Sequence, residues 1–234
     1  MNLNYLFICA FLVLTSIETA FAQVWEDGAN SVQNVAPVEP VIRTFEESDF
    51  NTYPWLKEFT NVIIVNKADS GESKQTIRLY VNGKLTLVSK VSTGRETFEK
   101  GCVAGQDPKR DHCSERAYWS TTPVGYFDVD KLVENYFSNL WKTWMPFAVF
   151  FESGIATHQA PAGTEGKLGG RASGGCVRLH PNVAPVIYKA VQDGGSGLVP
   201  ALNRDGQVKK TAAGDTIRRI GYKSLVIVEN VVVD

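Results

Sequence analysis

An Asn-Gly pair between two alternating runs constrains the fold of this 234-residue chain more than any other feature. The stretch is QTIRLYVNGKLTLVSKVSTG, residues 75–94. Its runs are rich in Val, Ile, Thr and Tyr and alternate with polar residues, as half-buried strands do. Asn82 and Gly83 tolerate the positive φ angles that a two-residue hairpin turn requires. The stretch therefore predicts a β-hairpin.

The same β pattern recurs along the chain. Strands are predicted in NVIIVNKA (61–68), VGYFDVD (124–130), FAVFFESGIATH (147–158) and SLVIVENVVV (224–233). Helical spacing predicts short helices over DKLVENYFSN (130–139) and VAPVIYKAVQ (183–192). The fold class is therefore mainly β, with mixed sheets and a few short helices.

Residues 1–22 are typical of a secretory signal peptide. The apolar stretch from Leu6 to Leu14 is too short to span a bilayer, and Ala20-Phe21-Ala22 follows it as a small-x-small cleavage pattern. We expect cleavage after Ala22, export to the periplasm or cell envelope, and no permanent membrane span in the mature protein. A short anchor and a buried N-terminal helix are the alternatives.

The remaining chain divides into an extension and a domain. Residues 23–59 show little periodicity and contain scattered prolines, which indicates an N-terminal extension or linker that partly packs on the domain. Residues 60–234 form the predicted domain, and the Gly-rich then charged stretch 193–218 is interpreted as a loop insertion. Lys and Arg number 24 against 25 Asp and Glu, a balance that argues against a nucleic-acid binder.

Three cysteines remain after cleavage. An odd number in an oxidising compartment indicates one disulfide and one free thiol, or an intermolecular bridge. Cys102 and Cys113 flank a short polar loop that a local disulfide could close. This pairing leaves Cys176 free.

Cys176 and His158 are candidates for thiol chemistry. A thiolate is a strong nucleophile, and a neighbouring imidazole manages its proton. The 17 residues between them are rich in glycine, so the chain can turn back and approach a ligand closely. The alternative is that Cys176 is a buried free cysteine and His158 a structural histidine, without a catalytic role. No metal site is expected, because His158, Cys176 and His180 lack metal-binding spacing.

These residues resemble the signature of the L,D-transpeptidase family, the YkuD-type catalytic domain. That family has a His, a spacer of this size, and then Ser-His-Gly-Cys; here the second part reads SGGCVRL. The stretches RLYVNGKLTLVSKVSTGRET and STTPVGYFDV are similar to its strand pair and its Thr-Pro segment. One departure is Gly174, which stands where the family has its second His. We expect Gly174 to allow backbone angles that His would resist.

The resemblance implies a fold and a set of roles. The fold is the L,D-transpeptidase catalytic fold, with β-sandwich-like mixed sheets. Cys176 would be the nucleophile, His158 the general base, and Ser173 a brace for the turn. The N–H groups of Gly175 and Cys176 would form the oxyanion hole. Arg178 would hold a carboxylate or shape the pocket, with a surface ion pair as the alternative.

The resemblance also implies an activity. Cys176 would attack a peptidoglycan tetrapeptide stem, release D-alanine and pass the acyl group to a second stem, which gives a 3-3 cross-link. No metal or organic cofactor is needed. Water as acceptor would make an L,D-carboxypeptidase, and a surface protein as acceptor would be anchored to the wall. A catalytically silent wall-binding module is a further alternative. A papain-like protease is disfavoured because there the Cys precedes the His.

Overall fold

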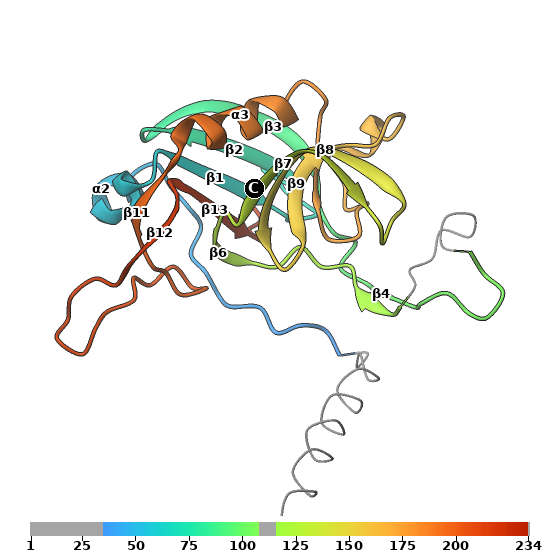
Figure 1. Ribbon diagram of the computed structural model, residues 1–234, viewed down its shortest axis with the longest axis horizontal. Coiled ribbons are helices and arrows are strands. Elements are labelled where there is room, and N and C mark those ends of the chain that lie inside the picture. The colour runs from blue at the N-terminus through green and yellow to red at the C-terminus, as the bar shows by residue number, and fades with distance from the viewer. Residues whose placement is uncertain (1–34, 108–115, 234) are drawn as a thin grey trace, which may run out of the picture. The chain divides into compact units, whose positions relative to one another are not determined.

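The computed structural model describes residues 35–107 and 116–233 (Figure 1). Its helical elements are α2 (Asp49–Thr52), η1 (Pro54–Glu58), η2 (Glu165–Lys167) and α3 (Ala184–Gly194). Its strands are β1 (Asn61–Asn66), β2 (Thr76–Val81), β3 (Lys84–Ser92), β4 (Phe98–Glu99), β5 (Tyr118–Trp119), β6 (Gly125–Asp128), β7 (Lys131–Ser138), β8 (Thr143–Glu152), β9 (Ile155–Gln159), β10 (Val177–Leu179), β11 (Ser196–Pro200), β12 (Arg218–Tyr222) and β13 (Ser224–Glu229).

Nine of these strands form one curled mixed sheet, in the order β6-β13-β1-β2-β3-β10-β9-β8-β7. The β1–β13 and β9–β10 pairs are parallel, and the other neighbours are antiparallel. The prediction of a mainly β domain with mixed sheets and few short helices is confirmed. Strands β3 and β10 join the two parts of the sheet, and this junction carries the candidate site.

The main core lies inside the curl. Ile63 and Val226 from one part of the sheet share a cluster with Val149 and Leu179 from the other. Helix α3 covers this core with Ala184, Ile187 and Val191, all fully buried, at a spacing that places them on one helix face. The predicted helix over 183–192 is thus confirmed.

The predicted hairpin is also confirmed. Strands β2 and β3 pair in antiparallel register around Asn82 and Gly83, whose φ angles are 51° and 73°. These angles match the type I′ turn, whose twist suits the flanking strands.

The predicted helix over 130–139 is wrong. These residues form β7, which pairs with β8 along its length. Its Val, Tyr and Phe residues favour strands, and pairing with a long neighbour outweighs an apparent helical spacing. The stretch 147–158 is likewise two strands, β8 and β9, separated by a turn at Ser153 and Gly154 with φ angles of 39° and 88°.

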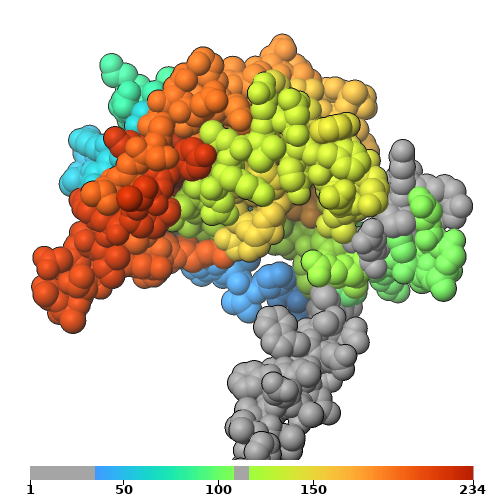
Figure 2. All heavy atoms as spheres, viewed as in Figure 1, coloured from blue at the N-terminus to red at the C-terminus, as the bar shows by residue number. Residues whose placement is uncertain are grey.

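The stretch 193–218 holds more regular structure than a loop insertion. It begins in α3, includes β11 and ends in β12, and the two strands pair as an antiparallel arm. Isolated bridges continue this pairing between Leu202 and Val208 and between Lys210 and Thr216. The arm projects from the sheet as the orange-red segment of Figure 2.

The second half of the predicted extension packs on the domain. Phe45, Phe50, Leu56 and Phe59 are buried in a second cluster with residues of β1 and β13. The signal-peptide prediction falls on residues 1–22, outside the described residues, and stays a prediction. Within 35–107 and 116–233, no helix has both the length and the apolar character needed to cross a bilayer.

Candidate active site

Strands β9 and β10 place three of the predicted site residues on one face. His158 and Arg178 are register partners across the parallel pair, and Cys176 lies directly before β10. Alternate residues of a strand point the same way, so the side chains of Cys176 and Arg178 share a face while Val177 between them enters the core. The local β-pairing therefore brings together residues 18 positions apart.

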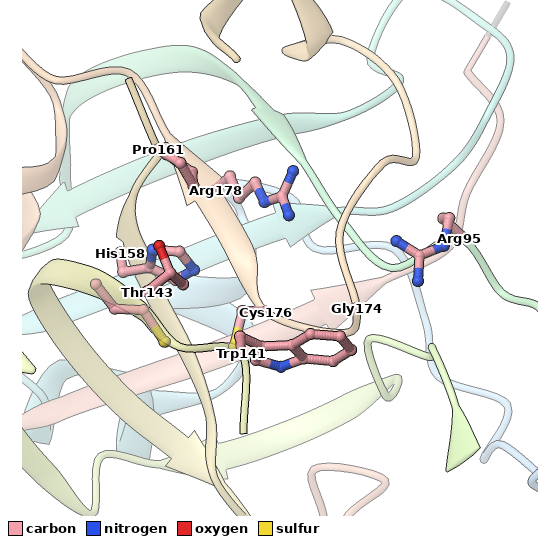
Figure 3. A pocket seen from close by; sticks show the side chains of 9 residues that line it. Arg95, Trp141, Thr143, His158, Pro161, Gly174, Cys176 and Arg178 are labelled. Carbon is pink, nitrogen blue, oxygen red and sulfur yellow. The ribbon is translucent and has the colours of Figure 1, made fainter. Parts of the chain in front are cut away.

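These side chains line a pocket of about 190 Å³ (Figure 3). The lining residues are Arg95, Trp141, Thr143, Met145, His158, Pro161, Gly174, Cys176 and Arg178. Sequence reasoning missed Arg95, Trp141, Thr143, Met145 and Pro161. Arg95 directly follows the quoted Ser-Thr-Gly stretch and could have been noticed, whereas Trp141 lies in the connection between two strands of which one was expected to be a helix.

Ser173 holds the turn before Cys176. Its hydroxyl donates to the carbonyl oxygen of Cys176 and accepts from the N–H of Gly175 at 3.0 Å. Gly175 has a φ of 129°, which only glycine adopts readily. Because the Gly175 N–H is already bonded to Ser173, the expectation that it lies open toward an oxyanion is wrong in this conformation. The N–H of Cys176 is the remaining candidate of the predicted pair.

The Ser-Thr-Gly stretch and the Thr-Pro segment meet at this turn. The Thr122 hydroxyl accepts from the N–H of Gly94 at 2.8 Å and donates to the carbonyl oxygen of Gly175 at 2.6 Å. A Cβ atom on Gly94 would lie 2.1 Å from the carbonyl oxygen of Ser120, so only glycine fits there. One hydroxyl thus joins three segments that are distant in sequence.

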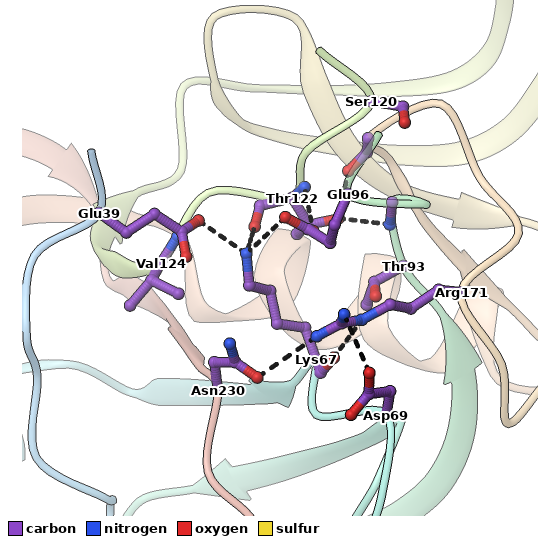
Figure 4. A network of polar contacts seen from close by, with 12 residues as sticks. Glu39, Lys67, Asp69, Thr93, Glu96, Ser120, Thr122, Val124, Arg171 and Asn230 are labelled. Carbon is purple, nitrogen blue, oxygen red and sulfur yellow. Dashed lines mark hydrogen bonds and ion pairs between the residues drawn. The ribbon is translucent and has the colours of Figure 1, made fainter. Parts of the chain in front are cut away.

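Lys67 anchors the back of this arrangement (Figure 4). Its side chain is 1% exposed, and its ammonium group bonds the carboxylates of Glu39 at 2.6 Å and Glu96 at 3.1 Å. It also donates to the carbonyl oxygen of Thr122 at 2.8 Å, and Glu96 accepts from the Thr122 N–H. Buried charge is stable only when it is paired and hydrogen-bonded in this way.

Gly174 is required for space rather than for backbone conformation. Its φ is not in the positive range, so the expectation of an unusual backbone angle is wrong. A Cβ atom here would lie 2.9 Å from Trp141 and 3.0 Å from the hydroxyl of Tyr118. These two rings contact each other edge to face, with centroids 5.5 Å apart. The aromatic pair therefore fills the space that a larger residue at 174 would need.

His158 is a neutral imidazole with a defined tautomer. Burial lowers its pKa to about 4, the nearby charge of Arg178 adds to this, and a hydrogen bond to the backbone opposes it. The bond joins Nδ1 to the carbonyl oxygen of Gln159 at 2.7 Å. A carbonyl can only accept, so Nδ1 carries the proton and Nε2 is free to accept one.

Cys176 is a half-buried free thiol that lines the same pocket as this imidazole. Burial raises the pKa of the thiol, whereas an N–H from Ala156 and the charge of Arg178 act in the opposite direction. A raised thiol pKa and a lowered imidazole pKa mean that both groups are neutral near pH 7. The accepting Nε2 of His158 lies in the same pocket as the thiol, so it is the candidate acceptor for the thiol proton.

The other predictions concern residues away from the pocket. The ring of His180 accepts from the N–H of Asn182, and its carbonyl oxygen accepts from the N–H groups of Val183 and Ala184, where α3 begins. Cys113 lies outside the described residues, so its pairing with Cys102 stays a prediction. Among residues 35–107 and 116–233, no cluster of His, Cys, Asp or Glu is suited to hold a metal ion.

Solved structures of L,D-transpeptidases resemble this chain. One from Xylanimonas cellulosilytica is 18% identical, with a TM-score of 0.45 over 73% of this chain and 60% of that chain. L,D-transpeptidase 3 of Mycobacterium tuberculosis is 17% identical, with a TM-score of 0.44 over 74% of this chain and 62% of that one. The chain spans less than two thirds of either structure. No curated protein matches it.

The fold and the pocket define a mainly β domain with an imidazole on β9 and a thiol directly before the adjacent parallel strand β10. The family profile of the L,D-transpeptidase catalytic domain, YkuD, matches residues 60–208, which is more than half of the chain. The chain belongs to this family.

Proposed function

We propose that the protein is an L,D-transpeptidase that acts on peptidoglycan tetrapeptide stems through a thioacyl intermediate on Cys176. The observation that carries the proposal is the neutral thiol of Cys176 in one pocket with the accepting Nε2 of His158. Family membership supports acyl transfer as the reaction class. With a signal peptide at residues 1–22, the mature enzyme acts in the periplasm or cell envelope.

The reaction has two half-steps. The sulfur of Cys176 attacks the carbonyl carbon at the L-centre of the third stem residue, and its proton passes to Nε2 of His158. Collapse of the tetrahedral species breaks the amide bond, and the same proton leaves on the amine of D-alanine. A side-chain amine of a second stem then attacks the thioester, loses its proton to His158 and forms the 3-3 cross-link, which regenerates the thiol.

Arg178 supports this proposal as a binder of a substrate carboxylate. Its side chain makes no ion pair or hydrogen bond with the described part of the chain, although it is half-buried. A guanidinium in such a place favours an anionic ligand, because it presents several fixed N–H donors to a carboxylate.

Purified tetrapeptide stems and the mature protein provide the test. We expect the wild type to convert them to 3-3 dimers and Cys176→Ala to have no measurable turnover, with an unchanged circular dichroism spectrum as the folding control. Intact-mass spectrometry of the wild type with a carbapenem should show one covalent adduct that Cys176→Ala lacks. Tripeptide without dimer would identify the L,D-carboxypeptidase instead. No conversion and no adduct would leave the silent wall-binding module.

A further inference from the structure

Two guanidinium groups face one pocket. Arg178 extends from β10 and Arg95 from the turn after β3, and in Figure 3 their side chains point toward each other across the pocket. Their positive charges interact, since Arg95 lowers the pKa of Arg178 together with the larger effect of burial. Like charges held close together raise the energy of the empty site unless an anion lies between them.

Arg95 is held in a fixed orientation by three neighbours. Its Nε donates to the carboxylate of Glu99 at 2.7 Å, one Nη donates to the hydroxyl of Tyr118 at 3.2 Å, and the other donates to the carbonyl oxygen of Ala172 at 3.4 Å. An arginine has five N–H groups, so two remain for a ligand. The single carboxylate of Glu99 balances one of the two arginine charges, and the pocket keeps an excess positive charge.

We propose that Arg95 and Arg178 together form a subsite for one carboxylate of the donor stem. This inference rests on the proposed function and adds that the donor stem must carry a free carboxylate. Arg178 is two residues after Cys176, which lies directly before β10, so their Cα atoms are at most about 7 Å apart. A carboxylate within about one residue of the attacked carbonyl would therefore reach Arg178 while the carbonyl lies at the sulfur. Tyr118 and Glu99 act as positioning residues, because they contact Arg95 rather than the stem.

The subsite predicts a selectivity. A stem with the free carboxylate makes charge-assisted hydrogen bonds with both guanidinium groups, whereas an amide of the same shape brings no charge and adds N–H donors that face other donors. Amidation of the recognised carboxylate should lower kcat/KM by roughly 10- to 100-fold. Stems differ in which carboxyl groups are free, so this pocket selects among them.

Three synthetic tetrapeptide stems test the subsite, each with one carboxyl group amidated: the terminal one, the distal one of the third residue, and that of the second residue. Acylation of the wild type is followed by mass spectrometry with each stem and with the free acid. We expect one amidation to lower kcat/KM by 10- to 100-fold and the other two to have small effects. The amidated stem with the lowered kcat/KM identifies the carboxylate that the subsite binds.

Arg95→Gln then tests the role of Arg95. This variant should lose most of the discrimination between the free acid and the sensitive amide, and Arg95→Lys should restore part of it. Arg218→Gln is the matched control, since Arg218 lies in β12 and does not line the pocket. An active wild type that treats all four stems alike, or full discrimination in Arg95→Gln, would overturn the subsite and leave the proposed function intact. An inactive wild type would instead count against the proposed function.

Discussion

Lys67 is a fully buried cation and Arg178 a half-buried one near the same turn, and the fold treats them in opposite ways. Lys67 is surrounded by two carboxylates and a carbonyl oxygen. Arg178 has no acidic partner in the described chain, and its nearest charged neighbour in the pocket is another arginine. A fully satisfied buried charge fixes a structure, whereas an unsatisfied one at a pocket wall is kept for a ligand. The comparison distinguishes the residues that hold the site in shape, such as Lys67, from those that face a ligand, such as Arg178.

Removal of Lys67 should have the largest effect on stability. Lys67→Met leaves the carboxylates of Glu39 and Glu96 without their cation, and breaking a buried pair on one side costs about 3–5 kcal/mol. Chemical denaturation should show this loss, with Lys57→Met, an exposed lysine of η1, as the control. A Lys67→Met protein as stable as the control would mean that the network is not a support.

The buried neutral state of His158 should appear as a pH dependence of stability. Its pKa is about 4 in the folded protein and near 6.5 in an exposed histidine, so the unfolded chain binds a proton first as the pH falls. The free energy of unfolding is therefore highest above pH 6.5, where His158 is neutral in both states. It decreases by about 3 kcal/mol between pH 6.5 and pH 4. The measurement is the free energy of unfolding of wild type and His158→Gln across this range. Parallel curves would contradict the buried neutral imidazole.

Arg178 should behave oppositely to Lys67. Arg178→Met removes a cation that the protein does not balance, so we expect the free energy of unfolding to change by less than about 1 kcal/mol. Acylation by the stem should fall roughly 10- to 100-fold, because a charged hydrogen bond to the ligand is lost. Thermal unfolding and acylation rates of the same preparation test both parts. A large stability loss with normal acylation would reverse the assignment.

Glu39 should have the smallest effect of the four. It is partly exposed, and when its ion pair with Lys67 is lost, Glu96 and the Thr122 carbonyl oxygen still contact the lysine. Glu39→Gln keeps a hydrogen-bond acceptor, so a loss of at most about 1 kcal/mol is expected from denaturation. A loss as large as that of Lys67→Met would show that the extension, rather than Glu96, balances the lysine.

Local patterns in the sequence predicted the parts of the site that depend on neighbouring residues. Asn82-Gly83 predicted the β2–β3 hairpin, and the apolar spacing of 183–192 predicted α3, because turn geometry and helix faces depend on short stretches of sequence. The motifs that resemble those of the L,D-transpeptidase family predicted that His158 and Cys176 belong to one catalytic domain. The β7 strand was misread, since its partner β8 decides its state.

Features that depend on distant residues were not predictable from the sequence. Nothing near Gly174 indicates that Trp141 and Tyr118 occupy the adjacent space. Likewise, Lys67 stands in an ordinary strand pattern, and its partners Glu39 and Glu96 are 28 and 29 residues away. The bond between the Gly175 N–H and Ser173 depends on the conformation of the turn, which the motif alone does not specify.

The position of Thr122 has a consequence for the order of folding. Its hydroxyl joins Gly94, 28 residues before it, to Gly175, 53 residues after it. Contacts of such long separation form slowly, because the intervening chain must lose its freedom before they can stabilise anything. The pocket therefore takes its shape among the last events, after the β2–β3 hairpin and α3 can already exist. Until nearly all of the domain has assembled, a newly made chain does not hold Cys176 and His158 in one pocket.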